Sequence, residues 1–257
     1  MKYLKPILFF IPFFCANANE AFSQTPIFSH ERYISEAGDT LNYRMLYPDW
    51  DTLRKYPLVI FLHGSGERGS DNESQLKFGI MDLAQTKISA MYPAFIIAPQ
   101  CPQNMRWANN SENNVSHQIH VLPSPSEPMK LLIELIQKLK KDLPVDTNRI
   151  YITGLSMGGY GTYDAIERYP NLFAAAVPVC GGGDTSKATS IAHIPVWIFH
   201  GAEDPIVSPL YSLNMLLALT GAGAHPGFTQ YPEVGHFANK GAYTDMQMIA
   251  WLFKQHK

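Results

Sequence analysis

The chain has 257 residues, of which 46% are hydrophobic and 16% are charged, and its formal net charge at pH 7 is −2. This apolar fraction is that of a globular protein and excludes a disordered chain. The 20 Lys and Arg residues are balanced by 22 Asp and Glu residues, so neither nucleic-acid binding nor electrostatic docking on a membrane is expected. Three cysteines are too few for a disulfide scaffold or a multi-cysteine metal site.

The first two dozen residues have the layout of a secretory signal peptide. Lys2 and Lys5 form a short positive start, residues 7–14 are almost entirely apolar, and small residues follow up to Ser23. The apolar run is too short to span a bilayer, so no stable membrane insertion is expected. We therefore expect residues 1–23 to be a signal peptide, and residues 24–257 to form one domain that is periplasmic or secreted.

Strand-like and helix-like segments alternate through the rest of the chain. Residues 28–47 indicate two short strands around a Gly-Asp turn. Five segments that are apolar throughout or nearly so predict strands covered on both faces, as in a parallel sheet: 58–62, 94–98, 149–153, 173–179 and 196–199. Helical patterns occupy 129–143, 158–169, 210–219 and 245–253. The alternation predicts an α/β domain whose ligand site lies at the carboxyl ends of the strands.

The segment 100–127 interrupts this alternation. It is polar, rich in Asn, Ser and Pro, and has no clear period. A loop of this length in a compact domain is usually functional or disordered. We expect it to form a rim or lid over the site.

Ser156 lies at the centre of Gly154-Leu155-Ser156-Met157-Gly158, directly between a predicted strand and a predicted helix. A sharp strand-to-helix turn presents the serine oxygen above the sheet, and the flanking glycines let the backbone crowd there. The alternative is a glycine-rich helix cap with an idle serine. A serine hydroxyl is a weak nucleophile at neutral pH, so it needs an adjacent base that an acid holds in one orientation.

The acid and the base are expected after the serine, in that order. Asp204 leaves the strand 196–199 and is the expected acid, with Glu203 and Asp184 as alternatives. His236 follows a short predicted strand at 228–231 and is the expected base. The other histidines that we considered are expected to have structural roles or to lie at the wrong end of the sheet, and no metal site is expected: His63, His117, His120, His200 and His225.

Attack on a carbonyl carbon creates an oxyanion, which preorganised N–H groups stabilise. One expected donor is the backbone of Met157, directly after the nucleophile. The second is expected in the glycine-rich segment 63–69, at Ser65 or Gly66, with Ser65 favoured. An ordinary glycine-rich turn is the alternative; a phosphate-binding loop is not expected because its Gly-Lys-Ser/Thr signature does not occur.

Together these motifs resemble the α/β-hydrolase superfamily over essentially the whole mature chain. Within it, the chain resembles the secreted esterase group that includes feruloyl and acetylxylan esterases and polyhydroxybutyrate-depolymerase-like proteins. The likeness rests on residues 62–69, 98–102 with Trp107 shortly after, 154–159, His200-Gly201 with Asp204, and Gly235-His236. It implies that residues 24–257 form a catalytic domain with an eight-stranded, mainly parallel sheet and helices on both faces.

The resemblance also implies ester hydrolysis through an acyl-enzyme, without a metal or organic cofactor. The substrate would be a small-molecule or polysaccharide-linked ester, such as a feruloyl or acetyl ester. Trp107 is expected to line an acyl or sugar subsite, with packing at the rim as the alternative. A peptidase, a polyester depolymerase and a non-catalytic binding protein are the competing hypotheses, and the sequence does not indicate an oligomeric state.

Cys101 and Cys180 both follow predicted strands, and export would permit a disulfide between them. In the usual strand order of this fold, the two strands lie three places apart, roughly 14 Å at ~4.8 Å per strand. Bonded cysteines need Cα atoms within about 7 Å. The loops would have to bend toward each other, so the pairing stays open.

Overall fold

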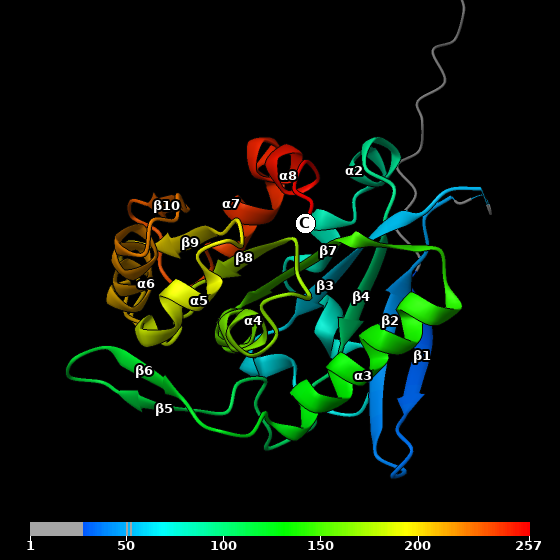
Figure 1. Ribbon diagram of the computed structural model, residues 1–257, viewed down its shortest axis with the longest axis horizontal. Helices are drawn as coiled ribbons and strands as arrows, with labels where there is room; N and C mark the ends of the chain where they lie inside the picture. The colour runs from blue at the N-terminus through cyan, green and yellow to red at the C-terminus, as the bar shows by residue number, and fades with distance from the viewer. Residues whose placement is uncertain (1–27, 50, 52) are drawn as a thin grey trace, which may run out of the picture.

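The computed structural model describes residues 28–49, 51 and 53–257, so the expected signal peptide lies outside the described residues. An eight-stranded sheet forms the centre, in the order β1-β2-β4-β3-β7-β8-β9-β10 (Figure 1). At one edge β1 (Ser29–Ile34) and β2 (Thr40–Leu46) form an antiparallel hairpin, and β2 is antiparallel to β4 (Phe95–Pro99).

The remaining strands run parallel: β3 (Tyr56–Leu62), β7 (Val145–Leu155), β8 (Ala175–Val179), β9 (Trp197–Gly201) and β10 (Gly227–Tyr231). All seven residues of β3 are buried, as the apolar run predicts. The predicted eight-stranded, mainly parallel sheet is therefore confirmed.

Helices cover both faces of the sheet (Figure 1). The longer helices are α3 (Glu127–Asp142), α4 (Met157–Arg168), α6 (Leu210–Gly221) and α8 (Met246–Leu252). The shorter ones are α1 (Ile80–Leu83), α2 (Thr86–Met91), α5 (Ala188–Ile191) and α7 (Asn239–Thr244), with 3-10 turns η1 (Ser65–Glu67), η2 (Ser74–Leu76) and η3 (Thr185–Lys187).

Alternate side chains of the central strands enter two separate cores. Leu58, Ile60 and Leu62 of β3 pack with α3, α4, α5 and α6 on one face. Val59 and Phe61 pack with α1, α2, α7 and α8 on the other. Burial on both faces explains why β3 is apolar at every position.

The segment 100–127 contains secondary structure that its polar sequence did not predict. Residues of β5 (Asn110–Asn113) and β6 (Gln118–Val121) form an antiparallel hairpin, which projects from the body of the molecule at the lower left of Figure 1. Contacts with distant parts of the chain hold it: the Val121 N–H donates to Asp184, and the Tyr211 hydroxyl donates to Asn114. The rim expected here is thus a structured hairpin.

Cys101 and Cys180 are both buried and free, so the disulfide that the sequence left open is not formed. Their strands, β4 and β8, lie three places apart in the sheet. In the part of the chain that the structure describes, no helix combines the length and apolar character needed to cross a bilayer.

Candidate active site

Ser156 occupies a strained backbone position between β7 and α4. Its φ is 57° and its ψ is −117°, a backbone conformation that residues other than glycine rarely adopt. Such strain costs of order 1–3 kcal/mol and is typical of functional turns. The Ser156 N–H donates to the Val179 carbonyl oxygen at 2.9 Å, which fixes the turn against the end of β8. The side chain is partly exposed.

Glycine is required beside this turn because three backbone segments meet there. A Cβ atom on Gly158 would overlap the carbonyl oxygen of Leu62 at the end of β3. A Cβ atom on Gly154 would lie 2.6 Å from the same oxygen. The two glycines flanking Ser156 therefore let α4 approach β3 and β7 closely enough to place the serine at the sheet edge.

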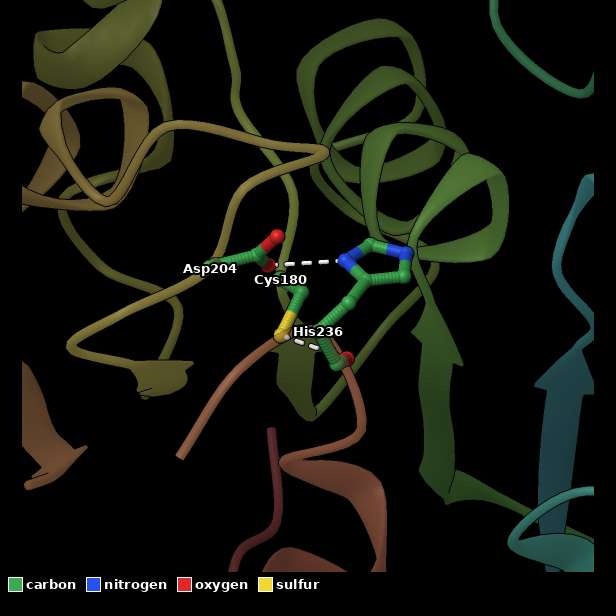
Figure 2. A group of neighbouring side chains, drawn as sticks. All are labelled: Cys180, Asp204 and His236. Carbon is green, nitrogen blue, oxygen red and sulfur yellow. Dashed lines mark hydrogen bonds and ion pairs between the residues drawn. The ribbon is translucent and has the colours of Figure 1, made fainter. Parts of the chain in front are cut away.

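Asp204 and His236 are in direct contact above the ends of β9 and β10 (Figure 2). The Asp204 Oδ2 atom accepts a hydrogen bond from His236 Nδ1 at 2.7 Å. Its Oδ1 atom accepts from the backbone N–H groups of Ile206 and Val207, each at 2.9 Å. With Nδ1 engaged, the imidazole has its Nε2 atom left to exchange a proton with a reactant.

The carboxyl group of Asp204 is stabilised as a carboxylate. Burial acts to raise its pKa, but hydrogen bonds from His200, His236 and the backbone of Val207 and Ile206 outweigh burial and hold the pKa well below its usual range. A negative charge beside Nδ1 keeps the imidazole in one tautomer and one orientation.

Two further side chains that the sequence analysis did not assign to the site contact this pair. His200 Nε2 lies 2.9 Å from the Val207 carbonyl oxygen and 3.3 Å from Asp204 Oδ2. The Cys180 thiol donates to the His236 carbonyl oxygen at 3.4 Å (Figure 2). A histidine directly before the Gly-Ala-Glu-Asp turn was the available signal for His200; nothing in the sequence indicated the contact of Cys180.

Among the described residues, Cys180, Asp204 and His236 offer potential metal-ligand atoms within 4.8 Å of one another. Burial raises the pKa of the Cys180 thiol to about 12. A metal binds the thiolate, so this thiol is a poor ligand at neutral pH. His117 packs its ring against Tyr211 with centroids 5.2 Å apart, away from this set.

A short series of contacts joins Ser156 to the His236 loop. The Ser156 N–H binds Val179, and the next residue, Cys180, binds the backbone of His236. The Ser156 hydroxyl itself makes no hydrogen bond to the imidazole here, and in unliganded sites such bonds often tighten only when substrate binds. The two alternative acids lie elsewhere: Glu203 is exposed, and Asp184 caps η3 through the N–H of Ser186 at 3.0 Å.

The two expected oxyanion donors, Met157 and Ser65, line the same pocket as Ser156. Met157 begins α4, and the first N–H groups of a helix have no partner within it. Ser65 and Gly66 are both exposed, but Ser65 begins η1 and lines a pocket together with Ser156 and Met157, whereas Gly66 lies outside that lining. Ser65, but not Gly66, therefore lines the pocket beside Ser156, and the identity of the second donor stays a prediction.

A buried histidine fixes the loop that carries Ser65. His63 Nε2 accepts from the Cys101 N–H at 2.9 Å, so its Nδ1–H donates to the Gly64 carbonyl oxygen at 2.6 Å. Burial lowers the pKa of His63 to about 4, which keeps the ring neutral. The structural role expected for His63 is thus to join the ends of β3 and β4 beneath the loop.

Trp107 does not line the pocket, so the expected contact with substrate is replaced by packing. Its side chain is fully buried, and its indole N–H donates to the His63 carbonyl oxygen at 3.2 Å. The Trp107 side chain lies against Gly161, where an added Cβ atom would overlap the Trp107 Cβ atom. Trp107 is buried because Gly161 has no side chain and leaves space for it on α4. The sequence of the loop alone does not indicate this space.

A pocket of about 290 Å³ opens beside Ser156. The hairpin segment contributes much of its wall through side chains that the sequence analysis did not single out for the site. Its lining residues are Ser65, Arg68, Arg106, Ala108, Asn110, Glu112, Ser156, Met157, Tyr160, Ile206 and Val207. The arrangement can hold a small acyl group against a serine hydroxyl and two backbone N–H groups.

Comparisons with known proteins agree with this geometry. Residues 126–198 match the prolyl oligopeptidase family. A thermostable esterase of known structure superimposes with a TM-score of 0.81 at 39% identity, over 90% of this chain and 63% of that one. A bifunctional acetylxylan esterase/xylanase from Neocallimastix patriciarum is 32% identical over 75 residues, which are 29% of this chain and 11% of that protein.

A probable carboxylesterase from Oryza sativa subsp. japonica is 25% identical over 205 residues, 70% of this chain and 81% of the relative. The chain spans less than two thirds of the thermostable esterase and about a tenth of the fungal enzyme. The sheet order, the strained serine turn and these likenesses together show that the chain has the α/β-hydrolase fold.

Proposed function

We propose that the protein is a serine hydrolase of carboxylic esters, with Ser156 as nucleophile, His236 as general base and Asp204 as the acid that orients it. The observation that carries the proposal is the 2.7 Å contact between Asp204 and His236, on loops that converge on the strained serine turn. Unreactive serines have no need of such a turn or of a buried carboxylate–imidazole pair.

The reaction follows from these positions. His236 Nε2 takes the proton of Ser156 as Oγ attacks the acyl carbon, and the Asp204 carboxylate stabilises the resulting imidazolium. The N–H groups of Met157 and Ser65 stabilise the oxyanion, with Gly66 as the alternative donor. His236 then protonates the leaving alcohol, and water repeats the cycle to release the acid. None of these steps needs a metal or an organic cofactor.

We further propose that the substrates are acyl esters linked to carbohydrate, such as acetyl or feruloyl esters, met outside the cytoplasm. The similarity to a fungal acetylxylan esterase/xylanase supports the substrate class. The charged start, short apolar run and small residues of positions 1–23 support export.

Amide hydrolysis is the second candidate, and the match of residues 126–198 to the prolyl oligopeptidase family favours it. The same serine, imidazole and oxyanion donors serve either bond; what differs is the leaving group that must be protonated. A polyester depolymerase would use the same groups on a polymer surface.

The test is a 4-nitrophenyl acyl series, assayed with the purified wild type, Ser156→Ala and Ser190→Ala, an exposed serine on α5 that serves as control. We expect turnover by the wild type and the control, and loss of all but residual activity in Ser156→Ala. Wild-type protein without turnover, or undiminished turnover in Ser156→Ala, would contradict the assignment and favour a binding protein. Methyl ferulate, acetylated xylan, polyhydroxybutyrate and an aminoacyl anilide then separate the substrate classes.

A further inference from the structure

The pocket beside Ser156 carries a net positive charge. Arg68 reaches it from the loop after β3, and Arg106 reaches it from the segment before β5. Glu112 on β5 is the single carboxylate among the described residues that line it, so two positive charges face one negative charge. The apolar residues of the lining are Ala108, Met157, Ile206 and Val207, beside the aromatic ring of Tyr160. The charge of this lining suits a short chain that ends in a negative group.

Both guanidinium groups have donors available to a ligand. Arg68 donates from Nε to the Ser65 carbonyl oxygen at 2.8 Å and from Nη1 to the Met105 carbonyl oxygen at 3.3 Å. It has no carboxylate partner in the described part of the chain. Arg106 is 68% exposed, and its Nη1 atom lies 3.6 Å from Glu112 Oε1. An exposed pair of this kind contributes about 0–1 kcal/mol, so a ligand carboxylate can displace Glu112.

Tyr160 adds a neutral donor to the same wall. Burial raises its pKa above the ordinary value, and the nearby Glu112 carboxylate acts in the same direction, so the phenol stays protonated. Its hydroxyl makes no hydrogen bond within residues 28–49, 51 and 53–257. A carboxylate bound by a planar guanidinium fork has further lone pairs that such a hydroxyl can satisfy.

The position of His236 indicates which half of the ester enters the pocket. The leaving alcohol must come within reach of His236 to receive its proton. His236 does not line this pocket, whereas Ser156 and both expected oxyanion donors, Met157 and Ser65, do. The pocket therefore lies on the acyl side of the bond that breaks.

We propose that this pocket selects esters whose acyl chain ends in a carboxylate, bound by Arg68 and Arg106: half-esters of short dicarboxylic acids. The inference rests on the proposed ester hydrolysis and names the substrate class of that same site. Guanidinium–carboxylate contacts supply the selectivity because they combine charge with two parallel hydrogen bonds.

The test compares matched charged and neutral substrates. The 4-nitrophenyl half-esters of succinic, glutaric and adipic acid are assayed beside their methyl esters, and the rate with Ser156→Ala is subtracted as background. We expect at least one half-ester to exceed its methyl ester in kcat/KM by roughly tenfold or more, with the preference falling as salt is added. Equal values for every pair overturn the proposal.

Two variants with opposite charge changes sharpen this test. Arg106→Gln is expected to reduce the charged-to-neutral ratio of kcat/KM by roughly tenfold, and Glu112→Gln to raise it several-fold by removing the competing carboxylate. Arg54→Gln is the control: it is 75% exposed and lies before β3, at the far end of that strand from the pocket. A ratio that moves in the same direction for Glu112→Gln and Arg106→Gln contradicts the proposal.

A second pair of substrates tests the acyl assignment. 4-Acetoxybenzoate carries its carboxylate on the leaving group, and its methyl ester is the neutral match. We expect no preference between them; a preference here and none in the half-ester series overturns the assignment to the acyl side.

Binding is measured apart from turnover by calorimetric titration of glutarate and of neutral glutaramide into the wild type and Arg106→Gln. The proposal for the pocket is supported if glutarate binds more tightly than glutaramide and Arg106→Gln weakens this binding. If that result is obtained but no ester is hydrolysed, only the proposed function fails. Hydrolysis of neutral esters without selective glutarate binding would mean that only the pocket assignment fails.

Discussion

His236 Nδ1 lies 2.7 Å from Asp204 Oδ2, although 32 positions of the chain separate the two residues. β9 and β10 run parallel and are paired from Trp197 to Gly201 and from Gly227 to Tyr231, so the loops that leave them emerge at the same sheet edge. The contact is therefore a direct consequence of the strand register.

Asp204→Asn tests what this contact does. An amide keeps the shape of the side chain but removes its charge and permits the other imidazole tautomer. We expect kcat to fall by about 10³–10⁴, as a lost carboxylate–histidine contact does in other serine hydrolases, with little change in KM. Glu203→Gln, an exposed neighbour, is the control. A loss of less than tenfold in Asp204→Asn, in protein shown to be folded by circular dichroism, would exclude this role for the carboxylate.

His63 makes the stability of the fold depend on pH. Its pKa of about 4 in the folded protein lies below the ordinary value of 6.5, so the unfolded chain binds more protons between these pH values. The unfolding free energy therefore decreases as pH falls through this window, by up to about 3 kcal/mol from this group. Urea unfolding at pH 7 and pH 4.5 measures the change.

Other groups titrate in the same range, so the comparison is made with His63→Gln, whose amide offers both a donor and an acceptor but does not ionise there. The difference in unfolding free energy between wild type and variant should shrink as pH falls from 7 to 4.5. A difference that is independent of pH would show that His63 keeps an ordinary pKa.

Gly158→Ala is expected to destabilise the protein severely because the added methyl group would overlap the Leu62 carbonyl oxygen. Forcing α4 away from β3 costs at least about 1–3 kcal/mol and displaces Ser156, so activity should fall with the melting temperature. Gly221→Ala is the matched control, because no atom lies within 4 Å of its added Cβ and it ends α6. Equal thermal denaturation of the two variants would rule out the close approach.

Both cysteines should resist thiol reagents in the native protein. Cys101 and Cys180 are fully buried, and burial raises the pKa of each thiol to about 12, so little thiolate forms at pH 8. We expect no rapid reaction with Ellman's reagent under native conditions and reaction of both thiols in urea without reductant. Failure to react in urea until reductant is added would show that the two are paired.

The sequence predicts those parts of the fold that have a local sequence motif or that are buried on both faces of the sheet. β3 is apolar at every position and is buried throughout, and the flanking glycines of Ser156 indicate the serine turn. The β5–β6 hairpin escapes prediction because its residues are polar and its position depends on partners such as Asp184 and Tyr211, more than 60 residues away.

The same distinction applies to the site. The order of Ser156, Asp204 and His236 follows from the order of the strands, so their convergence can be expected from sequence. Trp107 and Arg106 are neighbours in the chain, but the indole is buried against α4 and the guanidinium lines the pocket. Which of two adjacent side chains turns inward depends on the missing side chain of Gly161, a contact that only the folded chain reveals.

The most direct measurement of the central claim is the site of covalent labelling by a fluorophosphonate, followed by mass spectrometry of the intact protein and its peptides. We expect a single adduct on the peptide that contains Ser156, formed rapidly by the wild type and very slowly by His236→Gln. Labelling of a different residue, or equally rapid labelling of Ser156 without the imidazole of His236, would contradict it.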